Sequence, residues 1–285
     1  MSKLKKALEK AKEAREQGIT PTPEPEITAA AEHPPAAEKA PTPSPAPARS
    51  AARSQPQTKV MASKRETLKK NKIIAGLEPD AFSDHIKIMR TRILNLLEKT
   101  GGNSLLITSP LPGEGKTLTA INLAISISHE IDRTTLLVDA DLRTPMINNY
   151  FGIPNGKGLS DYLQDKATIP ELLINPGIEK LTILPGGSPI PNSSELLGAP
   201  RMESLVDEMK KRYPDRFLIF DSSSLLTSAD PLVFSRYIDG ILLVVEAERT
   251  PRSAIEQAME MLKDKPVLGT VFNKEKGRSR VIDQY

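Results

Sequence analysis

The sequence predicts an α/β domain built on a mostly parallel sheet with helices on both faces. Short apolar runs alternate along the chain with longer segments of helical periodicity, which is the order of a parallel sheet with crossover helices. The runs are apolar throughout rather than alternating, which indicates strands covered on both sides. Polar residues follow several of these runs, and the carboxyl ends of parallel strands are where ligands bind.

Each element is expected from one of these patterns. The apolar runs predict strands at 104–108, 135–138, 181–184, 217–220, 241–246 and 267–272. Apolar residues at intervals of three or four predict helices at 81–99, 117–129, 159–173, 193–212, 230–236 and 252–263.

The first 72 residues differ from the rest in composition. Residues 1–18 predict a short helix ending at Gly18, and residues 19–72 predict a disordered linker, because nine of the 25 prolines fall between Pro21 and Pro47. Residues 1–72 carry 15 Lys and Arg against 8 Asp and Glu, whereas the remainder carries 24 against 28. Such a basic segment suits an anionic membrane surface or an acidic partner, or is simply solvated. We assign the folded domain to residues 73–275 and a flexible tail to residues 276–285.

Composition also excludes several classes of protein. The chain has no cysteine, so disulfides and thiolate metal sites are excluded. No apolar run reaches ~18 residues, and no apolar segment follows the lysine-rich start, so neither a transmembrane helix nor a signal peptide is predicted. We expect a cytoplasmic protein, with no nucleic-acid partner, since the basic excess lies outside the folded part.

A phosphate-binding loop is predicted between the run at 104–108 and the helix at 117–129. Strand, glycine-containing loop, Gly-Lys-Thr and helix is the order of the P-loop of nucleotide-binding proteins, although Pro110 stands where the first glycine is usual. Backbone N–H groups and the helix N-terminus would bind phosphate oxygens, Lys116 would add a positive charge and the Thr117 hydroxyl would bind Mg²⁺. The nucleotide-binding residues expected here are Pro112, Gly113, Glu114, Gly115, Lys116, Thr117 and Leu118.

Carboxylates follow two other strands. Asp139 and Asp141 leave the strand at 135–138 on the same side of the chain, and Asp221 follows the strand at 217–220. Carboxylates in these places would hold Mg²⁺ or accept a proton from an incoming hydroxyl. Arg143 would neutralise the pair or bind phosphate.

Together these motifs resemble the bacterial tyrosine autokinases of capsule and exopolysaccharide export. The phosphate loop and the sequence 136–145, Leu-Leu-Val-Asp-Ala-Asp-Leu-Arg-Thr-Pro, carry most of the resemblance, which extends from about residue 75 to residue 285. The segments 192–202, 239–245 and 269–273 are also similar. The lysine-rich start and proline-rich linker are similar to the subgroup encoded with exosortase-type systems.

The resemblance implies a P-loop fold that binds ATP and Mg²⁺ and phosphorylates tyrosine. Lys116 would stabilise the transferring phosphoryl group, and Thr117, Asp141 and Asp221 would hold the metal. Asp139 would be the leading candidate to orient or deprotonate the tyrosine hydroxyl, with the reverse division between Asp139 and Asp141 left open.

Further implied roles concern the base, the acceptor and the partners. Asn273 would contact the adenine, Arg143 is counted among the catalytic residues, and Tyr285 would accept phosphate from a neighbouring subunit. The resemblance also implies a separate membrane-bound co-polymerase or chain-length protein as activator, which would bring the kinase to the inner face of the membrane.

Three departures bear on this interpretation. Asp84, Lys87 and Arg90 replace the family's Glu-x-x-Arg-x-x-Arg pattern, which weakens the case for a ring assembly. Residues 222–224 are three serines where the family usually has Thr or Ser followed by two prolines, and the change is expected to loosen the loop near the γ-phosphate without removing the carboxylate. Leu111 replaces the signature lysine of partitioning-type ATPases and argues against that class, while a regulatory ATP-binding scaffold without kinase activity stays open.

Overall fold

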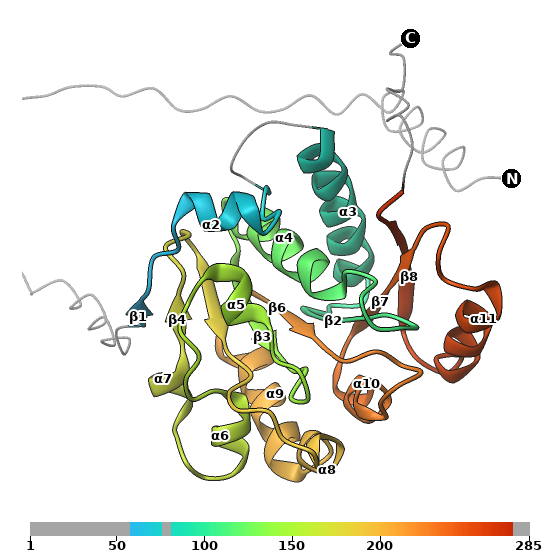
Figure 1. Cartoon of the computed structure of the whole chain (residues 1–285). Helices are drawn as coiled ribbons and strands as arrows, with labels where there is room; N and C mark the ends of the chain where they lie inside the picture. The colour runs from blue at the N-terminus through green and yellow to red at the C-terminus, as the bar shows by residue number, and fades with distance from the viewer. Residues whose placement is uncertain (1–57, 76–80, 276–285) are drawn as a thin grey trace, which may run out of the picture. The chain divides into compact units, whose positions relative to one another are not determined.

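The structure of the protein is a computed structural model that describes residues 58–75 and 81–275 (Figure 1). All of these residues belong to one compact unit. The predicted N-terminal helix, most of the linker and the tail with Tyr285 lie outside the described residues. The strands are β1 Lys59–Val60, β2 Ser104–Thr108, β3 Thr134–Asp139, β4 Ile174–Asn175, β5 Leu181–Leu184, β6 Arg216–Asp221, β7 Gly240–Glu246 and β8 Val267–Asn273. The helices are α2 Arg65–Lys70, α3 Ala81–Glu98, α4 Lys116–Ser128, α5 Ile147–Phe151, α6 Leu159–Leu163, α7 Ile169–Leu172, α8 Ser193–Leu197, α9 Pro200–Arg212, α10 Asp230–Phe234, the 3₁₀ helix η1 Ser235–Tyr237 and α11 Arg252–Met261.

The strands form a single sheet in the order β1-β4-β5-β3-β6-β2-β7-β8. Every neighbouring pair is parallel except β4 and β5, so the predicted mostly parallel sheet is confirmed. Strands β3 and β6 pair in register up to their last residues, where Asp139 lies opposite Asp221. This register brings two carboxylates together at the carboxyl ends of the central strands, where β2 also ends.

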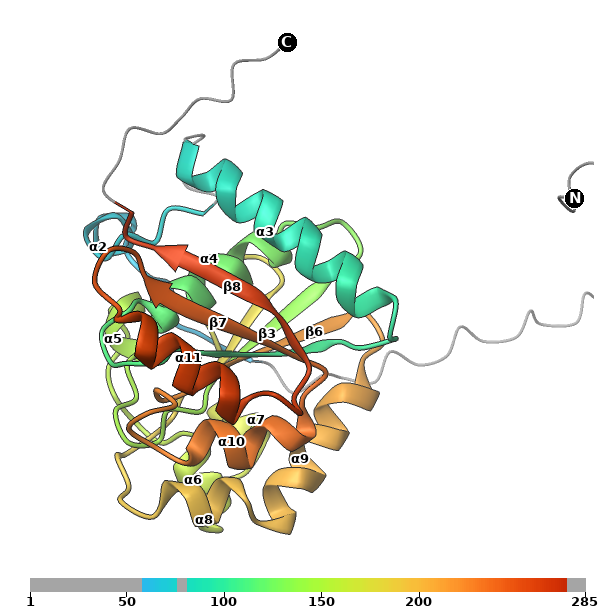
Figure 2. The same cartoon turned by 90° about the vertical axis from the view of Figure 1, so that its right-hand side faces the viewer.

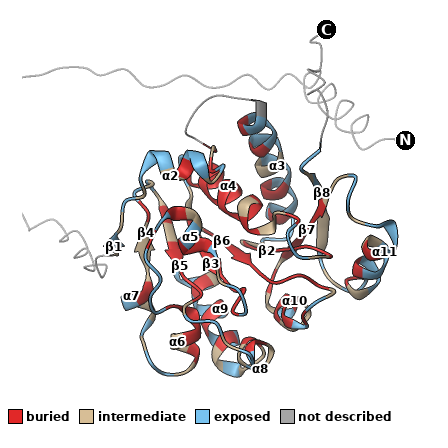
Figure 3. Ribbon diagram, in the orientation of Figure 1, coloured by how far each residue is buried: buried red, intermediate tan, exposed pale blue. Residues whose placement is uncertain are grey.

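Helices cover both faces of the sheet, as predicted. On β2, Leu105 and Ile107 pack with α2, α3, α4 and α5, whereas Leu106 packs on the other side with α6 to α11. Figure 3 shows the central strands and α4 buried, while α3 is exposed on its outer side. Figure 2 shows β8 at the edge of the sheet beside β7.

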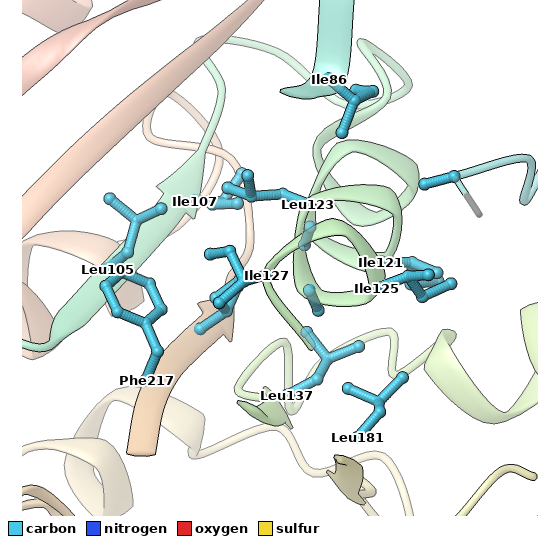
Figure 4. Packing of buried hydrophobic residues seen from close by; sticks show 14 of the residues in the cluster. Ile86, Leu105, Ile107, Ile121, Leu123, Ile125, Ile127, Leu137, Leu181 and Phe217 are labelled. Carbon is cyan, nitrogen blue, oxygen red and sulfur yellow. The ribbon is translucent and has the colours of Figure 1, made fainter. Parts of the chain in front are cut away.

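Helix α4 lies at the centre of one core. Its three isoleucines and Leu123 meet the side chains of β2, β3, β5 and β6, and Ile86 of α3 packs from the outer side (Figure 4). Full burial of one such side chain stabilises the fold by about 1.5–3 kcal/mol. The helix that begins at Lys116 is therefore fixed in position by packing along its whole length.

Several boundaries differ from the prediction. The expected helix at 159–173 is divided into α6 and α7, because Asp165 takes a left-handed conformation with φ of 60°. The expected helix at 193–212 is divided into α8 and α9, since Pro200 cannot continue a helix and starts a new one. Residues 59–72 were predicted as linker, but they contain β1 and α2. Within the described part of the chain, no helix is both long enough and apolar enough to span a bilayer.

Asp239 joins the starts of β2 and β7 at the end of the sheet opposite the carboxylates. Its Oδ2 accepts hydrogen bonds from the N–H groups of Asn103 and Ser104 and from the Ser104 hydroxyl, and Lys210 Nζ binds Oδ1. Burial alone would raise the pKa of Asp239, but Lys210 and the other donors outweigh it and lower the pKa below its ordinary 3.8. This carboxylate therefore stabilises the fold above pH ~4, and the contribution is lost as the pH falls through its lowered pKa.

We expect Asp239→Asn to lower the free energy of unfolding at pH 7 by roughly 1–3 kcal/mol, because it removes a charge that binds Lys210 and backbone N–H groups. Urea denaturation from pH 7 down to pH 3 measures the effect, which should shrink towards the acid end. Asp264→Asn, at an exposed aspartate, is the matched control. Equal small losses in both variants at pH 7 would contradict the role assigned to Asp239.

Candidate active site

The predicted phosphate loop connects β2 to α4, and its glycines are required by its conformation. Gly113 and Gly115 have φ of 83° and 96°, a region that favours glycine. A Cβ atom at Gly115 would also lie 2.1 Å from Nδ2 of Asn273. The helix begins directly after the loop, at Lys116, so its free N–H groups and positive end face the loop, as an anion site needs.

The side chain of Glu114 stabilises the conformation of the loop. Its carboxylate is buried and accepts hydrogen bonds from the N–H of Leu111, at 2.7 Å, and from the Thr250 hydroxyl. Because the carboxylate of Glu114 is occupied, we expect its backbone, and not its side chain, to make the predicted contact with the nucleotide. Sequence reasoning missed Thr250, which lies more than a hundred residues away and belongs to no recognisable motif.

The end of β8 also lies against the loop. Nδ2 of Asn273 donates to the carbonyl of Glu114 at 2.8 Å, and Nζ of Lys274 donates to the carbonyl of Gly113 at 2.6 Å. Lys274 is held in turn by the carboxylate of Glu246 at 3.0 Å. The structure thus places Asn273 at the site, while its contact with adenine stays a prediction.

Lys116 lies among the three carboxylates that the sequence singled out. Its Nζ is 2.9 Å from Oδ2 of Asp141 and 3.9 Å from Oδ1 of Asp221. Burial lowers the pKa of Lys116, but Asp221 and Asp141 outweigh burial, so the pKa is raised and the lysine stays charged. The structure therefore brings Lys116, Asp141 and Asp221 together as predicted.

Asp139 accepts hydrogen bonds from backbone N–H groups at both of its oxygens. Its Oδ2 accepts from the N–H groups of Met146 and Ile147 at 2.9 and 3.0 Å, and its Oδ1 accepts from the N–H of Asp141. Burial, together with the nearby charge of Asp221, raises the pKa of Asp139 well above 3.8, against the lowering effect of the Ile147 N–H. Asp139 thus shapes the loop between β3 and α5.

Asp221 is buried but has no such partners. Neither of its oxygens accepts a hydrogen bond from the described residues, and only 1% of the residue is exposed. Burial raises its pKa to about 6, although Lys116 and the Thr117 hydroxyl act in the opposite direction. An unsatisfied buried carboxylate beside a hydroxyl is a position at which a cation would be stabilised.

Arg143 does not pair with Asp139 or Asp141, so the expected neutralisation of these carboxylates is wrong, while its binding of phosphate stays a prediction. Its Nε donates to the Ser193 hydroxyl at 3.1 Å and lies 3.5 Å from Oδ2 of Asp230. Asp230 is fully buried at the start of α10 and also accepts from the Ser194 hydroxyl. Sequence reasoning missed Asp230, because an Asp-Pro pair at a helix start looks like an ordinary capping position.

The serine run after Asp221 does not loosen its loop, contrary to expectation. Ser222 donates from both its N–H and its hydroxyl to the carbonyl of Ile107, and the Ser224 hydroxyl pairs with that of Ser109. The N–H of Leu225 donates to the carbonyl of Ser109. These bonds fasten the loop to the end of β2, and the Ser224 hydroxyl contributes one of them at a position where the family has proline.

The charged residues of α3 do not form one free face. Lys87 pairs with Asp84 at 2.9 Å on the surface. Arg90 instead turns towards α4, where it donates to the carbonyl of Ser126 and pairs with Glu130 at 2.7 Å. Two of the three side chains remain exposed, and the third is used within the molecule.

Comparison with known proteins identifies relatives over most of the chain. No protein-family model matches. The tyrosine-protein kinase YwqD of Bacillus subtilis is 33% identical over 72% of this chain and 86% of its own length. The tyrosine-protein kinase CpsD of Streptococcus agalactiae is 30% identical over 60% of this chain and 73% of its own length.

Solved structures agree with these relatives. The kinase domain of the Escherichia coli tyrosine kinase ETK superposes with a TM-score of 0.69 at 26% identity, covering 80% of this chain and 93% of that one. The chimerical protein CapA2B2 gives 0.68 at 28% identity, covering 77% and 94%.

A more distant match shows the fold alone. The septum site-determining protein MinD of Pyrococcus horikoshii, solved with Mg-ADP, gives a TM-score of 0.51 at 23% identity and covers 62% of this chain and 72% of that one. The P-loop α/β fold is therefore shared more widely than the kinase activity. By its kinase relatives, the chain belongs to the bacterial tyrosine kinase (BY-kinase) family of capsule and exopolysaccharide systems and is a protein-tyrosine kinase.

Proposed function

We propose that this kinase transfers the γ-phosphoryl group of ATP to Tyr285 of a neighbouring copy of the chain. The observation that supports this most is the buried cluster of Lys116, Asp141 and Asp221 at the start of α4, directly after a glycine-containing loop. Phosphoryl transfer depends mainly on positioning and on stabilising charge, and a buried lysine among carboxylates supplies both.

The residues fit a Mg²⁺ ion bound together with the nucleotide. Asp221 has two unsatisfied buried oxygens, and Thr117 supplies a hydroxyl beside it. Among the described residues no group of three or more acidic, histidine or cysteine side chains forms a metal site by itself. A site with few protein ligands is compatible with Mg²⁺, because this ion usually keeps several waters and substrate phosphates in its shell. When bound, the ion would neutralise charge on the phosphates.

The hydrogen bonds favour a division of labour between the two aspartates of β3. Both oxygens of Asp139 already accept backbone N–H groups, so we assign it a positioning role. Oδ2 of Asp141 is bound by Lys116 and becomes free once Lys116 moves to the phosphates. We therefore assign Asp141 as the acceptor of the tyrosine proton. The tyrosine oxygen then bonds to the γ-phosphorus as the bond to the β-phosphate oxygen breaks, and ADP leaves.

Partner and location follow from the family as proposals. CapA2B2 is a chimera whose kinase-like fold matches this chain. We propose a separate membrane-bound co-polymerase or chain-length protein as activator, so that the kinase acts at the inner face of the membrane on polysaccharide polymerisation or export. The lysine-rich start and proline-rich linker support an assignment to the exosortase-linked subgroup.

A second candidate function for this protein is that of a regulatory scaffold that binds ATP but does not phosphorylate tyrosine. It is favoured by the tail, which carries one tyrosine rather than a cluster of several. The two candidates differ in whether phosphotyrosine forms, so one experiment separates them.

We expect Lys116→Met to abolish autophosphorylation, lowering the rate by several orders of magnitude, because the charge on the transferring phosphoryl group loses its buried counter-ion. Tyr285→Phe should remove the phosphate from the tail while leaving ATP hydrolysis in place. The full chain is incubated with Mg-ATP, with and without the cytoplasmic segment of the activator, and phosphate is mapped by mass spectrometry. Hydrolysis of ATP without phosphotyrosine in any of these conditions would favour the scaffold.

We expect Asp221→Asn to stabilise the ligand-free protein at pH 8 by roughly 1–3 kcal/mol, because a buried carboxylate with few partners loses its charge. The raised pKa sets the sign: the neutral carboxyl is favourable below pH 3.8, and this contribution is lost as the pH rises through about 6. The gain should therefore be small at pH 4. Urea denaturation at both pH values measures it.

The same variant tests the metal assignment. In the parent chain, ADP with Mg²⁺ should raise the melting temperature more than ADP alone, and Asp221→Asn should remove that difference. Asp264→Asn is again the control, since it changes the same group on the surface. A Mg²⁺-dependent rise that survives Asp221→Asn would place the metal elsewhere.

A further inference from the structure

We propose that Arg143, oriented by Asp230, binds a carboxylate of the acceptor segment, and that this carboxylate is Asp283 of the neighbouring copy. The inference rests on the proposed transfer to Tyr285. It adds a recognition site for the acceptor beside the phosphoryl-transfer site and assigns Asp230 as a positioning residue.

Arg143 is anchored at one end only. Its Nε is held between the Ser193 hydroxyl at 3.1 Å and Oδ2 of Asp230 at 3.5 Å. Asp230 is itself fixed, since the Ser194 hydroxyl donates to its Oδ1 and its own N–H donates to the Ser228 hydroxyl. The buried Oδ2 has no hydrogen-bond partner of ordinary geometry, so the arginine is its counter-charge.

The other end of the guanidinium is free to bind a ligand. The two terminal nitrogens of Arg143 form no hydrogen bond or ion pair with other described residues, and 43% of the side chain is exposed. A guanidinium held at Nε presents its terminal N–H groups in a fixed fork, which matches the two oxygens of a carboxylate or phosphate. The geometry therefore describes an oriented oxyanion site.

The position of Arg143 favours the acceptor over the nucleotide. Lys116 pairs with Asp141 and Asp221, whereas Arg143 pairs only with Asp230 among the described carboxylates. Its anchors belong to α8 and α10, which are outside the phosphate loop. Arg143 is nevertheless two residues from Asp141, the proposed acceptor of the tyrosine proton.

Asp283 is the ligand that the sequence offers at a matching distance. It is the one acidic residue of 276–285, and it precedes Tyr285 by two residues, a separation of at most ~7 Å along the backbone. A carboxylate bound by Arg143 would therefore bring the tyrosine hydroxyl into the neighbourhood of Asp141. The basic residues of the same segment would be repelled by Arg143, so Asp283 is the residue of this segment that the site favours.

The test separates kinase and acceptor onto two full-length chains. The kinase carries Tyr285→Phe and the acceptor carries Lys116→Met, so phosphate moves only between copies. The kcat and KM for phosphorylation of Tyr285 are measured with Arg143→Gln in the kinase, Asp283→Asn in the acceptor, and both. Each single change should raise the KM for the acceptor about ten-fold, and the double change should cost little more than either alone.

Companion variants separate recognition from folding. Asp230→Asn in the kinase should raise the same KM, and Arg143→Lys should fail to restore binding, because an ammonium lacks the fork. Asp283→Glu in the acceptor should retain most of the affinity. Arg201→Gln, at an arginine of comparable exposure paired with Asp165, is the matched control.

The outcomes are distinct. If Tyr285 is phosphorylated and the effects of Arg143→Gln and Asp283→Asn multiply independently, Arg143 binds another anion and this inference is overturned while the proposed function stands. If the unaltered pair of chains leaves no phosphate on Tyr285, the proposed acceptor is wrong and the recognition site falls with it. A raised KM that depends on both residues together supports the site.

Discussion

The ion pairing of Lys116 with buried carboxylates is the interaction on which the site depends. A lysine and three aspartates in a buried position are costly to desolvate. The pairing of Lys116 with Asp141 and Asp221 compensates this cost only in part. Asp221 in particular is left with unsatisfied oxygens. Binding of a magnesium nucleotide at this place, as we propose, would neutralise the unsatisfied charge of Asp221.

The parallel sheet is what makes this arrangement possible. The β3–β6 register sets Asp139 opposite Asp221, and β2 brings the phosphate loop beside them. Burial of α4 along its length fixes the position of its first residue, Lys116, so the loop before it has little conformational freedom. Bonds from Thr250, Asn273 and Lys274 add a second restraint from the end of the chain. The loop is consequently preorganised, which is the main requirement of phosphoryl transfer.

Sequence patterns predicted those parts of the molecule that depend on local order. Six strands, α3, α4 and the loop could be read from apolar runs and from Gly-Lys-Thr, because each signal lies within a few residues. The pairing of Arg143 with Asp230, of Glu114 with Thr250 and of the serine run with β2 joins residues that are far apart in the chain. No local pattern reports such contacts, so the expectations that Arg143 neutralises Asp139 and Asp141 and that the serines loosen their loop were wrong. The carboxylate of Glu114 is bound by Leu111 and Thr250, which the sequence did not indicate.

A crystal structure of the full chain with ADP and Mn²⁺ in place of Mg²⁺ would test whether the cluster of Lys116, Asp141 and Asp221 binds the metal and the phosphates. The anomalous signal of manganese locates the metal directly. We expect a manganese ion bonded to the Thr117 hydroxyl beside Asp221, and Lys116 moved from Asp141 to the phosphates. Nucleotide bound in the loop with the metal away from Asp221, or with Lys116 still paired to Asp141, would contradict this expectation.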